Sequence, residues 1–346
     1  MSDERAAPQA GAPLAVILGC AGERLAAAEA RFFAAANPVG FILFRRNCRA
    51  PDQVRGLVES LRDCLGRAEA PVLIDQEGGR VARLGPPAWR RYPAAAAIAA
   101  LPDPLAQEAA RLGSRLIADD LERLGISVAC LPVLDLPVDG ADPVIGDRAY
   151  GSEPARVAAL GRAVCDGLLE GGVLPVLKHI PGHGRAGIDS HFALPAVAAS
   201  QAALSQTDFA PFRALAAMPW AMTAHIIYMT IDGAAPATLS PRIIGEVIRT
   251  EIGFDGVLVS DDLSMRALSG SLGERARLAL AAGCDLVLHC NGDPDEMEEV
   301  AAGARPLAAA GAGRLARAAA MRRPPAAFHR RETERRFDVL IRGLRP

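Results

Sequence analysis

The sequence Val173-Leu174-Pro175-Val176-Leu177-Lys178-His179 contains the pattern from which the architecture follows, because an unbroken apolar run ends in two polar residues. Continuous apolarity is typical of a strand buried on both faces, as in a parallel sheet. The preceding segment, 153–169, repeats apolar residues at helical spacing. The stretch therefore predicts a helix followed by one strand of a parallel sheet.

Seven further apolar runs share this character. They are Leu14–Gly19, Gly40–Phe44, Pro71–Ile74, Ile126–Leu131, Trp220–Ala224, Gly256–Val259 and Asp285–His289. Segments of helical period lie between them, including 107–124 and 200–217. Eight strand-then-helix units favour an α/β fold, a closed (β/α)8 TIM-type barrel, over an open sheet.

The ends of the chain are expected to differ from the barrel. Residues 1–12 are rich in Ala, Pro and Gly and predict a flexible tail. Residues 13–346 are expected to form one catalytic barrel, with terminal helices at 294–320 and 329–343 packed on it. No second domain is expected, so every catalytic group should come from the barrel.

Composition narrows the classes of function and the compartment. A net charge of -2 over 346 residues gives no electrostatic footprint for nucleic acid or an anionic membrane surface. Seven cysteines without a C-x-x-C pair favour reduced thiols and a cytoplasmic location. Ile17–Cys20 loosely matches a lipoprotein cleavage site, but the apolar run is short and no basic segment precedes it.

Polar side chains follow the apolar runs at their carboxyl ends. They are Asp75, Lys178, His179, His225, Asp261 and Asp262. The carboxyl ends of barrel strands carry the active site, so these groups are expected to converge in space. Strands that merely end in polar residues at the rim would account for one or two of them.

The segment 178–191 holds half of the six histidines and admits several interpretations. His179 and His183 have the spacing of a zinc-binding helix, but Pro181 would break that helix. Residues 182–187 match G-x-G-x-x-G, yet no helical pattern follows to meet a pyrophosphate. The favoured interpretation is a mobile loop in which Asp189 orients His191 for acid–base work. An exposed loop with incidental polar residues is the alternative.

Two other segments carry candidate chemistry. At Asp261-Asp262, one carboxylate could attack an anomeric carbon or both could bind a metal, whereas Asp262 could simply cap the next helix. The segment from Asp75 to Arg83, with Arg148 as a separate candidate, could bind sugar hydroxyls or form a salt-bridge cluster at the rim.

Together these segments resemble glycoside hydrolase family 3, and most of all its bacterial β-N-acetylhexosaminidases of cell-wall recycling. The resemblance rests on 75–81, 178–184, 189–191 and 260–265, with smaller matches at 37–44, 132–136, 222–225 and 282–285. These pieces run in the family's order from about residue 14 to 292. Three departures are Cys20 after the first strand, Ile180, and the loop filling at 185–188.

The resemblance implies a retaining exo-β-N-acetylglucosaminidase that acts on peptidoglycan fragments. Asp261 would be the nucleophile, and His191, paired with Asp189, the acid–base. The residues implied to bind N-acetylglucosamine are Asp75, Arg83, Arg148, Lys178 and His179. No cofactor, metal, nucleic acid or membrane is implied, and the chain is expected to act as a monomer on a small carbohydrate. A phosphorylase of the same bond and a non-catalytic sugar-binding barrel are the alternatives.

Overall fold

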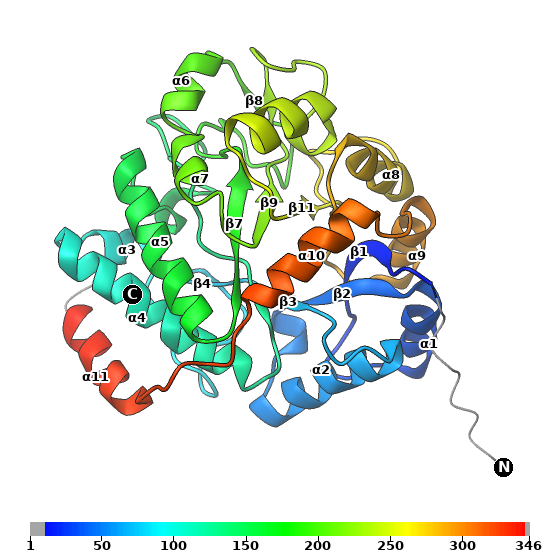
Figure 1. Cartoon of the computed structure of the whole chain (residues 1–346), viewed down its shortest axis with the longest axis horizontal. Coiled ribbons are helices and arrows are strands. Elements are labelled where there is room, and N and C mark those ends of the chain that lie inside the picture. The colour runs from blue at the N-terminus through cyan, green and yellow to red at the C-terminus, as the bar shows by residue number, and fades with distance from the viewer. Residues whose placement is uncertain (1–10, 343–346) are drawn as a thin grey trace.

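The computed structural model describes residues 11–342, and its centre is a closed barrel of eight parallel strands (Figure 1). The strands are β1 (Leu14–Gly19), β2 (Pro38–Leu43), β3 (Val72–Ile74), β6 (Val128–Ala129), β7 (Leu174–Ile180), β9 (Trp220–Thr223), β11 (Val257–Asp262) and β12 (Leu286–His289). They pair in sequence order, and β12 closes onto β1. All eight predicted strands are present, which confirms the barrel.

Helices surround the barrel. They are α1 (Ala27–Ala36), α2 (Pro51–Leu65), α4 (Asp103–Glu122), α5 (Pro154–Glu170), α6 (Gln201–Gln206), α7 (Ala210–Ala214), the π-helical η4 (Ile243–Glu251), α8 (Leu272–Ala282) and α9 (Pro294–Gly303). Helix α5 illustrates their origin, because the Glu153 side chain accepts the amides of Ala155 and Arg156 and Pro154 occupies the first turn. Its buried positions Val157, Leu160, Val164 and Leu168 recur at helical spacing.

Two predicted helices are each split in two. The helix expected over 200–217 is interrupted between α6 and α7, where Asp208 turns inward to pair with Arg185 and Pro211 begins a new helix. The helix expected over 294–320 ends at Gly303, and a second one, α10 (Ala309–Met321), follows Pro306. The segment between them hydrogen-bonds to β1, since Ala15 donates to the Arg305 carbonyl at 2.9 Å.

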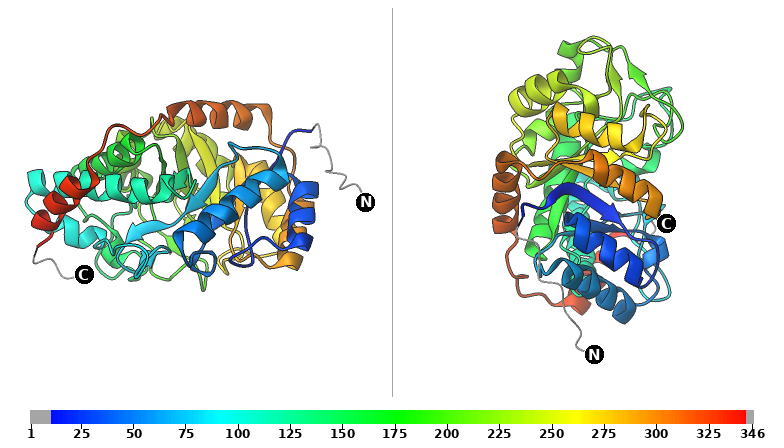
Figure 2. Two further views of the ribbon diagram at one scale, coloured as in Figure 1. Left: turned by 90° about the horizontal axis from the view of Figure 1, so that it is seen from below. Right: turned by 90° about the vertical axis from the view of Figure 1, so that its right-hand side faces the viewer.

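The two terminal helices pack at different places, α10 at one end of the barrel and α11 on an outer helix. Helix α10 lies across the end at which the strands begin, where Leu315 borders a cavity shared with Leu174 and Trp220 (Figure 2). Helix α11 (Arg330–Leu340) packs on α4. The end at which the strands finish is left to the loops that carry the candidate site.

Three observations concern the N-terminal segment and the membrane. The Leu14–Gly19 run is barrel strand β1, and the Cys20 thiol behind it is buried, which raises its pKa to about 12. Within residues 11–342 no helix is long and apolar enough to span a membrane. The expected tail falls mostly on residues 1–10, outside the described residues.

The attachment of α11 gives the first prediction. Phe337 is fully buried, and its ring would lie 2.9 Å from a Cβ placed on Gly113 of α4. Phe337→Ala should therefore lower the free energy of unfolding by about 3–5 kcal/mol, measured by urea titration. Val339→Ala on the same helix is the control, because Val339 is 53% exposed and should change stability by about 0.5 kcal/mol at most. Equal losses in both variants would contradict this packing.

Candidate active site

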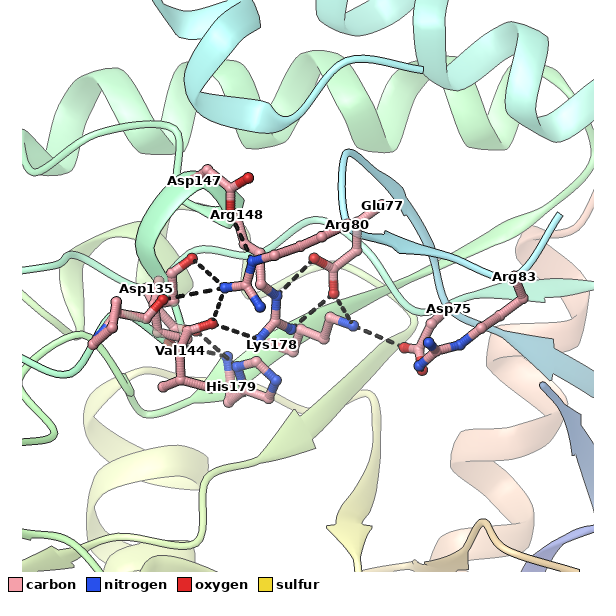
Figure 3. Close-up of polar contacts among 12 residues, drawn as sticks. Asp75, Glu77, Arg80, Arg83, Asp135, Val144, Asp147, Arg148, Lys178 and His179 are labelled. Atoms are coloured by element: carbon pink, nitrogen blue, oxygen red, sulfur yellow. Dashed lines mark hydrogen bonds and ion pairs between the residues drawn. The ribbon is translucent and has the colours of Figure 1, made fainter. Parts of the chain in front are cut away.

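Of the polar residues predicted to converge, Asp75, Lys178 and His179 lie together at the carboxyl end of the barrel (Figure 3). Asp261 lies near enough to His179 and His225 for both to lower its pKa. Asp75 follows β3, Lys178 and His179 lie within β7, and Asp261 lies within β11. Beyond β3 a small hairpin, β4 (Gln76–Gly78) and β5 (Val81–Ala82), carries Glu77 and leads to Arg83. Its turn depends on Gly78, whose φ is 100° and whose missing Cβ leaves room for the Pro93 carbonyl.

Five of these side chains form one buried sequence of ion pairs, here called the ion-pair chain. Arg83 donates to Asp75 at 2.8 Å, and Lys178 donates to the other oxygen of Asp75 at 2.9 Å. The same ammonium lies 2.6 Å from Glu77. Both oxygens of Glu77 accept from Arg148 at 2.8 Å, in a bidentate pair. Figure 3 shows the chain running from Arg83 at one end to Arg148 at the other.

The charges of the ion-pair chain stabilise one another. Burial alone would raise the pKa of Asp75 and of Glu77. Instead, Lys178 and Arg83 hold the pKa of Asp75 below its ordinary range, and Lys178 and Arg148 do the same for Glu77. Burial opposes the charge of Lys178 as well, and the two carboxylates raise its pKa above the usual value. All of these groups stay ionised near neutral pH, so they present fixed charges and hydrogen bonds to a ligand.

Lys178 is the only lysine in the sequence, since every other strongly basic position is arginine. Its side chain is 2% exposed and fits between two carboxylates as a compact point charge. A planar guanidinium has a different shape and a fixed fork of donors, so it would not occupy the same space. The site therefore uses lysine where the rest of the chain uses arginine.

A second buried carboxylate, Asp135, fixes the end of β7. Its Oδ2 lies 2.7 Å from Nδ1 of His179, and its Oδ1 accepts the backbone amides of His179 and His183 at 3.1 and 2.7 Å. Burial opposes its charge, but His179 and these hydrogen bonds lower its pKa. Because Nδ1 of His179 faces a carboxylate, it carries the proton, and Nε2 is the ring nitrogen available to a ligand.

The adjacent carboxylates Asp261 and Asp262 have different surroundings. Asp262 accepts from the Ser264 hydroxyl at 2.6 Å and from the Cys290 amide at 3.2 Å, so it links the turn after β11 to the residue that follows β12. It stabilises a turn rather than capping the following helix, whose cap is Ser271. Asp261 accepts the Asp262 amide at 2.8 Å. Burial opposes its ionisation, but His179 and His225 hold its pKa below the ordinary value.

The structure brings Asp189 and His191 together at the barrel mouth. His191 Nδ1 lies 2.7 Å from Asp189 Oδ1, which also accepts the His191 amide at 2.9 Å. The side chain of His191 is 59% exposed and that of Asp189 is 21% exposed. The loop returns to the β11 side of the barrel, where Ala267 donates to the Ser190 carbonyl at 3.2 Å. His191 also contributes to lowering the pKa of Asp261.

The base of this loop is anchored, including its unusual residues. Arg185 pairs with the buried Asp208 at 2.7 Å, and Ala186 is buried. Gly184 approaches the Leu136 carbonyl so closely that a Cβ would lie 1.9 Å from its oxygen. His183 Nε2 bonds Ser190 Oγ at 2.9 Å, and burial lowers the pKa of this imidazole to about 4. The anchors leave the segment around His191 as the exposed part of the loop.

The zinc-helix and dinucleotide interpretations of this segment lack structural support. His179 lies in strand β7 and His183 in the following turn, so the two do not share a helix. No helix begins after the glycines at 182–187. Within residues 11–342 no group of three or more His, Cys, Asp or Glu side chains is arranged to hold a metal ion.

Sequence reasoning missed two residues of this cluster, and it gave a third, His225, only as a polar residue that follows a strand. Glu77 was not predicted as a site residue, although its place in the hairpin after β3 was a usable signal, and Asp135 follows the apolar run 126–131 in the same way. His225 followed a strand as predicted, but Nδ1 lies 2.7 Å from Thr238 Oγ1 and Nε2 lies 3.1 Å from the Asp262 carbonyl. Its ring is buried and occupied, which suits a supporting role.

Comparisons with known proteins identify the family. The family model described as the glycosyl hydrolase family 3 N terminal domain matches residues 14–317. A β-hexosaminidase of Alkalilimnicola ehrlichii is 41% identical over 283 residues, covering 80% of each chain. A β-hexosaminidase of Pseudomonas aeruginosa is 41% identical over 255 residues, covering 73% of this chain and 75% of that one. The chain belongs to glycoside hydrolase family 3 and is a glycosidase.

Solved structures of similar proteins support the same family and fold. NagZ from Neisseria gonorrhoeae in complex with N-trifluoroacetyl-D-glucosamine superposes with a TM-score of 0.84 and 32% identity, covering 96% of this chain and 98% of that one. A family 3 β-N-acetylglucosaminidase from a Paenibacillus strain gives a TM-score of 0.83 and 31% identity, covering 94% of this chain and 66% of that one.

The ion-pair chain gives the second prediction. Glu77→Gln leaves Lys178 and Arg148 buried without their shared partner, so it should lower the free energy of unfolding by about 3–5 kcal/mol at pH 7. The control is Asp147→Asn, which removes a carboxylate from a half-exposed pair with Arg80 and should cost about 1 kcal/mol or less. Urea titration of both variants checks this.

The same variants should also differ in their pH dependence. The pKa of Glu77 is lower in the folded chain than its ordinary value of 4.5, so its contribution is present above that value and is lost as the pH falls through the folded pKa. The gap between the wild type and Glu77→Gln should therefore narrow below about pH 4.5. A gap that stays constant down to pH 3 would contradict the ionised pair.

Proposed function

We propose that the chain is a retaining exo-β-N-acetylhexosaminidase that removes terminal N-acetylglucosamine from peptidoglycan fragments. The observation that carries the proposal is the Asp189–His191 pair at 2.7 Å, on a loop that hydrogen-bonds to the segment just after Asp261. A histidine that can exchange a proton and a separate, ionised carboxylate are the two groups that retaining chemistry needs. The names of the relatives and the N-acylated glucosamine bound to NagZ support the choice of sugar.

In the first step the Asp261 carboxylate attacks the anomeric carbon, and the bond to the aglycone oxygen breaks. Protonated His191 gives its Nε2 proton to that oxygen, so the aglycone leaves as an alcohol. The imidazole becomes neutral. It keeps the proton on Nδ1, which donates a hydrogen bond to Asp189. Burial opposes the charge of Asp189, but hydrogen bonds from His191 hold its pKa below the ordinary value, so the carboxylate remains an acceptor.

In the second step neutral His191 takes a proton from water, and the oxygen of that water attacks the anomeric carbon. The bond to Asp261 breaks, which returns the carboxylate and releases the sugar with its original configuration. Asp189 stabilises the imidazolium that forms, and it keeps the ring oriented with Nε2 toward the site. Water can reach the imidazole for this step, because the His191 side chain is largely exposed.

The ion-pair chain and His179 supply the sugar-binding groups. Asp75, with its neighbours Arg83 and Lys178, offers both an acceptor and charged donors for adjacent hydroxyls. Arg148 holds Glu77 in place and adds a further donor at the far end of the chain. His179 offers Nε2, since Nδ1 is bound to Asp135. All of these groups come from one barrel, so we propose that the monomer is sufficient for activity.

A cytoplasmic location is part of the proposal. Each of the seven cysteines is free, and burial raises the pKa of thiols such as Cys20 and Cys284 to about 12. Thiols of this kind are poorly reactive and suit a reducing compartment.

The acid–base role of His191 gives the third prediction. A nitrophenolate leaves with little help, whereas a sugar alkoxide needs a proton. His191→Ala should therefore slow glycosylation by about 10²–10⁴-fold for a disaccharide and far less for the nitrophenyl glycoside. Asp189→Ala should follow the same trend more mildly, because the imidazole remains but loses its orientation. Single-turnover rates over a series of leaving groups check this.

The exposed His329, at the start of α11, provides the control, and His329→Ala should leave every rate unchanged. A loss in His191→Ala that is equal across the series would show that the loop only positions the substrate. The same assays with inorganic phosphate separate hydrolysis from phosphorolysis, because a sugar phosphate product would assign the chain to the second reaction. Tight sugar binding without turnover would instead indicate a non-catalytic barrel.

A further inference from the structure

The segment that carries Asp261 extends beyond the regular strand pairing of the barrel. Strand β9 pairs with β11 over residues 257–259, and within the described residues this ladder ends there. On the other side, the register with β12 shifts between Val259 and Asp262, and the Ser260 hydroxyl oxygen accepts the Leu288 amide at 3.0 Å. The proposed nucleophile is therefore placed by side-chain contacts as well as by strand pairing.

His225 supplies such a contact on the β9 side of this segment. It lies two residues after β9, and its side chain is fully buried. Its Nε2 lies 3.1 Å from the carbonyl oxygen of Asp262. Because a carbonyl oxygen can only accept, Nε2 carries a proton and donates the hydrogen bond. The imidazole thus links the end of β9 to β11 beyond the point where the two strands stop pairing.

Thr238 fixes the tautomer of this imidazole. It lies in the short helix η3 (Ala237–Leu239), and its Oγ1 is 2.7 Å from His225 Nδ1 and 2.7 Å from Thr223 Oγ1. Burial lowers the pKa of His225 against the opposing effect of Asp261, so the ring is neutral near pH 7. Since Nε2 holds the one ring proton, Nδ1 accepts from the Thr238 hydroxyl. The hydroxyl of Thr223 donates in turn to Thr238.

The contact made by His225 reaches Asp261 through a single residue. Asp262 is held at its carbonyl by His225, and at its side chain by the Ser264 hydroxyl and the Cys290 amide. The amide of this anchored residue donates to Asp261 Oδ1 at 2.8 Å. One carboxylate oxygen of Asp261 is therefore fixed by a backbone amide, and Oδ2 is the oxygen that would attack the sugar.

We propose that His225 is a positioning residue for the nucleophile Asp261, and that Thr238 acts through it by keeping the proton on Nε2. This inference rests on the proposed function. Both ring nitrogens of His225 are engaged within the protein, so neither is available to a sugar. Attack on the anomeric carbon needs close alignment, and a misplacement of about 1 Å can cost about 10²-fold in rate. Loss of the contact should slow bond formation to Asp261 and leave sugar binding by the ion-pair chain unchanged.

The first test compares two substitutions of His225. The glutamine amide nitrogen reaches the position of Nε2, whereas that of asparagine reaches only the position of Nδ1. His225→Asn should therefore slow single-turnover glycosylation by about 10²-fold, and His225→Gln should recover most of that loss. The loss should be the same for every leaving group, unlike that of His191→Ala, because Asp261 must attack whatever group departs. The affinity for N-acetylglucosamine as a competitive inhibitor should stay at the wild-type value in both variants.

Thr238 provides a second test that holds even if His225→Asn does not fold, which urea titration shows. Thr238→Val keeps the shape of the side chain but removes the hydroxyl, so the ring proton can move to Nδ1. The glycosylation rate should fall by about two- to tenfold, as expected for one weakened hydrogen bond, and Thr238→Ser should restore it. The matched control is Ser114→Ala, which removes a buried hydroxyl that donates to the Ala110 carbonyl within α4 and should leave the rate unchanged.

Three results would overturn the positioning role. They are a wild-type rate in both His225→Asn and Thr238→Val, a glutamine variant no faster than the asparagine variant, and a loss of inhibitor affinity as large as the loss of rate. Each of these leaves the proposed function intact, provided that the wild type cleaves a nitrophenyl N-acetylglucosaminide through a covalent species on Asp261. A wild type that forms no such species contradicts the proposed function, and the positioning role fails with it.

Discussion

The ammonium of Lys178 lies in the buried mouth of the barrel, 2.9 Å from Asp75 and 2.6 Å from Glu77, and the site depends on this contact. The ammonium, together with Arg83 and Arg148, lowers the pKa of the two carboxylates against the effect of burial, and the carboxylates raise the pKa of the lysine in return. The contact joins β7 to the hairpin that follows β3, so it ties segments about 100 residues apart. Arg83 and Arg148 extend it in both directions and give the proposed sugar site its fixed charges.

The anchored residues at the base of the 183–191 loop contrast with the exposed part of the loop around His191. Asp135 holds the backbone at His179 and His183, and Arg185 is paired with Asp208, so the base of the loop is tied to the barrel at several points. His191 lies beyond these anchors and is largely exposed. In the proposed mechanism His191 must meet first an aglycone and then water, so it benefits from this access, whereas Asp261 as the nucleophile benefits from a fixed position.

The barrel could be predicted from the sequence because each parallel strand contains an apolar run, as expected for a strand that is buried on both faces. The places where helices break were not predicted. Residues 200–217 have helical periodicity throughout, and the break lies where Asp208 meets Arg185, a contact between distant segments that local pattern does not reveal. Pro211, in the first turn of α7, was the local signal of a new helix. Pro306 was visible in the sequence, and it should have split the second long helix.

Polar residues that follow strands could be identified from the sequence, but the residues with which they form ion pairs and hydrogen bonds could not. Asp75, Lys178, His179 and Asp261 were predicted from position alone, and the structure gathers them. Glu77 and Asp135 were overlooked because their importance lies in which groups they bridge, and that is set by tertiary geometry. The difference between Asp261 and Asp262 is also tertiary, since the Cys290 amide from β12's end engages only Asp262.

The most direct test of the account is to trap the glycosyl-enzyme with a 5-fluoro N-acetylglucosaminyl inactivator and to locate the label by fragmentation mass spectrometry. Cleavage at Arg249 and Arg266 releases one peptide, residues 250–266, that contains both Asp261 and Asp262. The account predicts one label per chain, on the side chain of Asp261. A label on Asp262 or on Glu77, or steady turnover with no covalent species, would contradict the assignment of Asp261 as nucleophile.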